Sequence, residues 1–170
     1  MFSCRSFSCY IGLYNGTVAL TIEIAEQQSA HAVDAARLKK AVRGVLAEVG
    51  VRSGEISVAI VGDERMHELN RQYLAHDYPT DVLSFVLDRN ETAGHLEGEI
   101  IASADYAARE AARYCWTTDD ELLLYVIHGC LHLVGHDDQT PEGAAAMRAA
   151  ETKHLAAFGL QHRYGDASAT

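Results

Sequence analysis

Two histidines in the C-terminal half of the chain, His128 and His132, are spaced to bind one metal ion. They are four residues apart, so on an α-helix they lie on one face, about one turn apart. Gly135 follows, the residue type that most readily ends a helix in a left-handed turn. After such a turn, Asp137 or Asp138 can fold back toward the histidines. Two imidazoles and one carboxylate leave a fourth position open, which is typical of a catalytic rather than a structural zinc site.

A histidine pair at this spacing also occurs without any metal, so the surrounding residues decide between the two interpretations. Residues 122–127 are an apolar run, which predicts that the helix is buried. Burying two imidazoles there without partners costs about 1–3 kcal/mol for each unsatisfied group. The glycine and the acidic residues that follow favour a metal site. Cys130 lies on the other side of the helix from His128 and is expected in the core rather than on the metal.

The other segments predict the elements that position this helix. Alternating apolar and β-branched residues indicate strands at residues 18–24, 56–61, 81–87 and 96–102. A short polar turn separates the last two strands, so we expect them to form an antiparallel pair. Helical patterns that begin at a capping side chain follow Ser29, Asp63 and Ser103, and they predict helices over residues 30–49, 63–73 and 103–114.

The last two helices also have recognisable starts. Residues 118–121 are predicted to form a capping box that opens the metal-binding helix. Thr140 and Pro141 open the final helix, which Gly159 ends. Its expected core face consists of Ala146, Met147, Ala150 and Leu155. The predicted fold is therefore α/β (α+β), a small mixed four-stranded sheet covered by helices, with the metal site on a C-terminal helix.

Length and composition limit the class of protein. A chain of 170 residues with 48% hydrophobic residues fits one globular domain over residues 18–164, with a disordered extension at 1–17 and a frayed tail at 165–170. No apolar run approaches the roughly 20 residues of a membrane span. The four cysteines form no CxxC pair, which favours reduced thiols and a cytoplasmic protein. A net charge of −10 argues against nonspecific nucleic-acid binding, although a local basic groove is still compatible with it.

Several sequence blocks together resemble the YbeY family, bacterial endoribonucleases that act in the maturation of ribosomal RNA. The first block is HGxLHLxG at residues 128–135. The second is LN at 69–70 followed by DxPTDVLSF at 77–85, and the third is GEII at 98–101. The order and spacing of the elements from about residue 18 to residue 159 are similar to the family throughout.

The resemblance implies a single-strand-directed endoribonuclease with small-subunit ribosomal RNA as substrate. Small-subunit ribosomal or assembly proteins are the implied partners, and no membrane is involved. One zinc ion is the implied cofactor, although nickel or another divalent metal suits these ligands too. We predict that His128, His132 and Asp138 hold the metal and act in catalysis through it. The turn at residues 79–81 is expected near the metal, and Ser84 is a candidate for contact with substrate or with a neighbouring loop.

The end of the first block departs from the family pattern. The family motif usually finishes Gly-Tyr-Asp-His, whereas this chain has Gly135-His136-Asp137-Asp138. Asp138 therefore occupies the position of the third histidine ligand, and it lowers the net charge of the site by one. His136 is a ligand only if the helix runs through Gly135. Otherwise His136 and Asp137 are expected to support the site without touching the metal.

A second departure concerns a basic residue. The family commonly carries an arginine where this chain has Leu74. Arg71 and His76 are close in sequence and are candidates for a substitute phosphate contact, or else ordinary surface residues. The missing arginine favours an alternative function, a non-enzymatic ribosome assembly factor whose metal is structural.

A zinc metalloprotease is the other alternative, because the spacing of the histidines resembles that of metzincin proteases. Those enzymes need a glutamate directly after the first histidine as general base. The chain has Gly129 there, which has no side chain to act. The sequence therefore argues against peptide hydrolysis by that mechanism.

Overall fold

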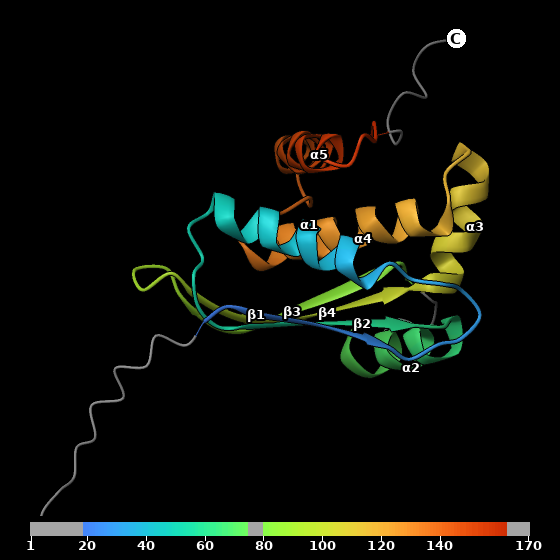
Figure 1. Ribbon diagram of the computed structural model, residues 1–170, viewed down its shortest axis with the longest axis horizontal. Coiled ribbons are helices and arrows are strands. Elements are labelled where there is room, and N and C mark those ends of the chain that lie inside the picture. Colours follow the sequence, from blue (N-terminus) through green and yellow to red (C-terminus); the bar gives the residue numbers. More distant parts are fainter. Residues whose placement is uncertain (1–18, 75–79, 163–170) are drawn as a thin grey trace, which may run out of the picture.

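A computed structural model of the chain describes residues 19–74 and 80–162. Four strands form one sheet in the order β1-β2-β4-β3, and five helices surround it (Figure 1). Strands β1, β2 and β4 are parallel, while β3 is antiparallel to β4 as the sequence predicted. The elements are β1 (Thr21–Glu26), α1 (Ala35–Glu48), β2 (Glu55–Val61), α2 (Asp63–Leu74), β3 (Val82–Asn90), β4 (His95–Ser103), α3 (Ala104–Tyr114), α4 (Thr118–Leu133) and α5 (Pro141–Ala156).

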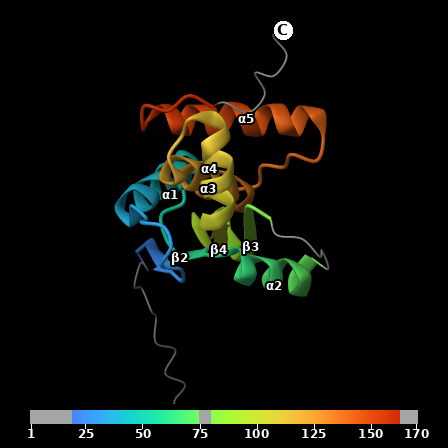
Figure 2. The same ribbon diagram turned by 90° about the vertical axis from the view of Figure 1, so that its right-hand side faces the viewer.

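The helices form layers on the two faces of the sheet. Helices α1 and α4 cover one face, α5 lies outside them, and α2 covers the opposite face (Figures 1 and 2). The arrangement confirms the predicted mixed sheet covered by helices. Among the described residues, no helix is long and apolar enough to span a membrane.

Helix α4 is buried along most of its length. Its residues Leu122, Val126 and Ile127 have no exposed surface. A helix that is apolar all round must be covered all round, and α4 contacts α1, α3, α5 and the sheet. Cys130 is also buried in this core, as expected. The C-terminal end of α4, which carries the predicted ligands, is therefore held by packing on several sides.

Two glycines bring α4 unusually close to the sheet. A Cβ atom on Gly129 would lie 2.9 Å from Cγ2 of Ile100 and 3.1 Å from Cγ2 of Val82. A Cβ atom on Gly98 in β4 would lie 2.9 Å from Cδ1 of Leu133. A side chain at either position would require these neighbouring side chains to move. The close approach places the C-terminal half of α4 directly beside β3 and β4.

Helix α1 begins later than predicted. Its cap is Asp34 rather than Ser29, and the Asp34 carboxylate accepts a hydrogen bond from the Arg37 amide at 2.9 Å. Upstream, the Gln28 side chain forms two hydrogen bonds with the backbone of His31 and closes a separate turn. The prediction that α1 begins after Ser29 was wrong, because Gln28 and His31 form this separate turn before Asp34.

The capping box of α4 is one residue earlier than predicted. Thr117, not Thr118, is the cap, and its hydroxyl accepts a hydrogen bond from the amide of Asp120. The Asp120 carboxylate in turn accepts from the amide of Thr117. Two adjacent threonines made the register ambiguous in the sequence, and the carboxylate three residues after Thr117 resolves it.

Thr140 caps α5 and Pro141 is its first residue, as predicted. Met147 and Leu155 are buried, but Ala146 is exposed and the prediction for it was wrong. Glu151 occupies the buried face instead, with only 5% of its surface exposed. Strand bounds differ from prediction chiefly at β1, which runs from Thr21 to Glu26, and at β3, which continues to Asn90.

Candidate metal centre

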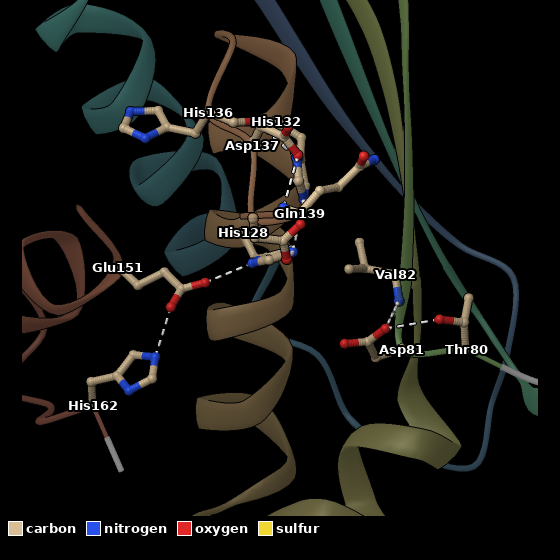
Figure 3. A network of polar contacts seen from close by, with 11 residues as sticks. Thr80, Asp81, Val82, His128, His132, His136, Asp137, Gln139, Glu151 and His162 are labelled. Carbon is tan, nitrogen blue, oxygen red and sulfur yellow. Dashed lines mark hydrogen bonds and ion pairs between the residues drawn. The ribbon is translucent and has the colours of Figure 1, made fainter. Parts of the chain in front are cut away.

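Three side chains at the C-terminal end of α4 converge on one point. His128, His132 and Asp138 each place a possible ligand atom within 4.8 Å of the other two (Figure 3). Helix α4 ends at Leu133, and Gly135 has a φ of +100° that turns the chain back. The Nε2 atoms of His128 and His132 are 3.0 Å apart. The Asp138 carboxylate lies 3.7 Å from the first and 3.9 Å from the second.

Hydrogen bonds on the far side of each ring fix which nitrogen carries the proton. Nδ1 of His132 is 2.9 Å from the backbone carbonyl of His136. Nδ1 of His128 is 2.6 Å from Oε1 of Glu151. A carbonyl and an ionised carboxylate can only accept, so both Nδ1 atoms donate. Both Nε2 atoms therefore present lone pairs when the rings are neutral.

The resulting contact between the two rings requires a positive charge. Two lone pairs 3.0 Å apart repel each other unless a metal ion or a shared proton lies between them. The carboxylate of Asp138 faces the same point and favours a divalent cation further. Tetrahedral zinc with bonds of about 2.0–2.1 Å separates its ligand atoms by roughly 3.4 Å. The observed separations of 3.0, 3.7 and 3.9 Å bracket that value, so the three side chains fit a metal ion.

Glu151 and His162 support the site from α5 and from the segment after it, and the sequence analysis missed both. Oε2 of Glu151 is 2.7 Å from Nε2 of His162, and its Oε1 binds His128 (Figure 3). Burial raises the pKa of Glu151, but hydrogen bonds from both histidines outweigh it and lower the pKa to about 2. Burial likewise opposes protonation of His128, yet the Glu151 carboxylate raises its pKa overall. A glutamate on the apolar face of α5, between Met147 and Leu155, was the available signal.

His136 and Asp137 contribute little through their side chains. The helix does not run through Gly135, and the His136 ring points away from the two ligand rings (Figure 3). Only its backbone carbonyl joins the site. Asp137 is exposed, and its carboxylate accepts from the amide of Gln139 at 3.1 Å, which stabilises the returning turn.

The remaining candidates for substrate contact lie in different parts of the chain. Arg71 is exposed on α2, on the opposite face of the sheet from α4, and is not part of the ligand group. His76 lies outside the described residues. Val82 faces Gly129 of α4, so Ser84, two residues along β3, is on the same face and is half-buried. Ser84 is thus on the face of the sheet that α4 covers.

A cleft of about 320 Å³ opens beside the ligand group. His128 and Asp138 form part of its wall, and Asp81 lines it from the start of β3. Tyr106 of α3 and Arg148 of α5 also line it. The turn at residues 79–81 was predicted to lie near the metal. Asp81 agrees with this prediction, because it lines the same cleft as His128 and Asp138.

The α/β fold, the two histidines with one carboxylate, and the adjoining cleft are the features of a metal-dependent hydrolase. The sequence matches the family Endoribonuclease YbeY over residues 23–159. The chain therefore belongs to the YbeY family of endoribonucleases, and the resemblance of its motifs is confirmed.

Curated relatives and a solved structure agree with this assignment. The Endoribonuclease YbeY of Rhodopirellula baltica is 42% identical over 73% of this chain, and the match spans 64% of that relative. The Endoribonuclease YbeY of Syntrophus aciditrophicus is 36% identical over 86% of this chain and 93% of its own length. A solution structure from Thermotoga maritima has a TM-score of 0.56 at 27% identity, covering 79% of this chain and 86% of that one.

Because Glu151 orients His128 through a hydrogen bond, replacing Glu151 should weaken metal binding. Glu151→Gln removes the negative charge and leaves a single accepting oxygen for two histidines, so the hydrogen bond that orients His128 is weakened. We expect zinc to bind about 10–100-fold more weakly, as is typical when such an outer partner is lost. Competition with a chromophoric chelator measures the affinity. Glu142→Gln, an exposed position on the same helix, is the matched control. Equal zinc affinity in both variants would contradict the prediction.

Proposed function

We propose that this chain is a metal-dependent endoribonuclease that cleaves single-stranded regions of small-subunit ribosomal RNA. Zinc is the proposed metal, with His128, His132 and Asp138 as its ligands. Small-subunit ribosomal or assembly proteins are the proposed partners, and the cytoplasm the proposed location. The observation that carries the proposal is the pair of Nε2 lone pairs held 3.0 Å apart beside a carboxylate, in a chain of the YbeY family.

The residues of the site would have two roles: some would supply positive charge to the substrate, and others would hold the metal ligands in position. A bound zinc ion supplies a Lewis acid that polarises a phosphoryl oxygen or activates a water molecule. Glu151 and the His136 carbonyl hold the two imidazoles in the orientation that binding needs. Arg148 is exposed on the wall of the cleft and offers a cation for a substrate phosphate. Such a contact matters in a chain of net charge −10 that has Leu74 in place of the family arginine.

The metalloprotease alternative has less support. Position 129 has no room for a glutamate, because even a Cβ atom there meets Ile100 and Val82. The assembly-factor alternative differs in what the metal is for. A structural metal sustains the fold and partner binding, whereas a catalytic metal sustains cleavage in a chain that remains folded without it.

One experiment distinguishes the nuclease from the assembly factor. The full chain is purified, its metal content measured, and a structured fragment of small-subunit ribosomal RNA incubated with it before and after chelation. We expect about one zinc per chain, and cleavage in unpaired regions that chelation stops and added zinc restores. Asp138→Ala should lose both metal and cleavage. Bound metal without cleavage, together with loss of folding on chelation, would favour the assembly factor.

A further inference from the structure

Asp81 is held rigidly at the start of β3. Its backbone carbonyl accepts a hydrogen bond from the amide of Ser103 at 2.8 Å. One carboxylate oxygen, Oδ1, accepts both from the amide of Val82 and from the hydroxyl of Thr80, each at 2.9 Å. Both contacts use the same oxygen. The other oxygen, Oδ2, points into the space between β3 and α4, toward the side of His128 (Figure 3).

Asp81 lies near the predicted metal ligands but is not one of them. It lines the same cleft as His128 and Asp138. It is nevertheless outside the group of ligand atoms that lie within 4.8 Å of one another. Its negative charge still reaches His128, where it contributes to the raised pKa of the imidazole. Asp81 therefore stands across the cleft from the metal ligands rather than among them.

The other carboxylates of the cleft are already committed. Both oxygens of Glu151 bind histidines, and Asp138 belongs to the ligand group. Glu110 of α3 forms an ion pair with Arg113 at 2.9 Å. Among the described residues that line the cleft, Asp81 is the carboxylate with an oxygen turned toward the metal ligands and engaged by neither a ligand histidine nor an arginine.

We propose that Asp81 is the general base of the cleavage reaction, an inference that rests on the proposed endoribonuclease function. Oδ2 takes a proton from the attacking water as the water oxygen forms a bond to phosphorus. The bond from phosphorus to the leaving ribose oxygen breaks, and that oxygen takes up a proton from solvent. The two hydrogen bonds to Oδ1 hold the carboxylate so that Oδ2 keeps facing the attacking atom, a geometry that a general base requires.

The test is the isosteric variant Asp81→Asn, in which the side-chain oxygen can keep both hydrogen bonds of Oδ1 while the amide nitrogen replaces Oδ2. We expect kcat for the RNA fragment to fall about 10²–10⁴-fold. KM and the thermal midpoint should stay at wild-type values, and about one zinc per chain should remain bound. The exposed Asp88 of β3 gives the matched control, Asp88→Asn.

A second variant separates a chemical role from a structural one. Asp81→Ala opens a space that formate can enter, so added formate should restore part of the lost rate. Wild-type rates in Asp81→Asn would overturn the proposal, as would loss of zinc in parallel with loss of cleavage. A wild-type protein that binds zinc but cleaves no RNA would overturn the proposed function itself. The wild-type control therefore tells the two failures apart.

Discussion

His132→Ala should abolish metal-dependent RNA cleavage and weaken zinc binding by about two to four orders of magnitude. Structural zinc sites are worth about 10–16 kcal/mol in total. If this free energy is divided equally among three or four ligands, the loss of one ligand costs roughly 2.5–5 kcal/mol, which is about two to four orders of magnitude in affinity. His132 is half-buried at the end of α4. Its removal also relieves the repulsion between two Nε2 lone pairs, so the fold should survive in the absence of metal.

The measurement pairs zinc affinity with thermal stability in chelator. His95→Ala is the control, because His95 lies at the start of β4 and outside the ligand group. Full zinc content in His132→Ala would show that the zinc binds elsewhere in the protein. An unfolded variant would instead indicate that the ring serves packing, in which case His132→Gln provides a less disruptive comparison.

Gly129→Glu should destabilise the fold by about 4 kcal/mol or more. Overpacking a core contact costs about 1–3 kcal/mol, and burying a carboxylate without a partner adds several more. The new side chain would meet Ile100 and Val82, where a Cβ atom alone is already 2.9 Å and 3.1 Å from its neighbours. This glutamate is the residue a metzincin-type protease needs, yet we expect no peptidase activity to appear. Urea denaturation measures the free energy of unfolding.

Gly44→Glu on α1 is the matched control for that prediction. Gly44 is exposed, and the nearest atom to a Cβ there is 4.0 Å away, on His154. Glutamate favours a helix over glycine by several tenths of a kcal/mol or more. The control should therefore be as stable as the wild type or slightly more so. Equal stability of the two variants would mean that α4 can move away from the sheet at little cost.

Local features of the sequence were sufficient for much of the fold and for the ligand group. The apolar run of α4 predicted a buried helix, and Gly135 predicted where the chain turns. The three residues expected to bind metal span positions 128–138, so a helix and one turn bring them together. These predictions depend on contacts between residues that are near one another in sequence.

Contacts between distant segments could not be predicted in the same way. Glu151 reaches His128 only because α5 packs against α4, and Asp81 faces the cleft only because β3 lies at that edge of the sheet. On its own, a glutamate on an apolar helix face does not reveal its partner. The helix starts at Asp34 and Thr117 were missed for a different reason, since several capping residues stood close together and each offered a plausible register.

The two histidines proposed as metal ligands differ in how much sequence variation their hydrogen-bond partners can tolerate. The partner of His132 is a backbone carbonyl, which any residue at position 136 supplies. The partner of His128 is the side chain of Glu151, which a substitution can remove. Position 136 can therefore be tyrosine or histidine without changing the geometry of the HGxLHLxG block at residues 128–135. Position 151 has no such freedom, so we expect relatives that bind the metal in this way to keep a carboxylate there.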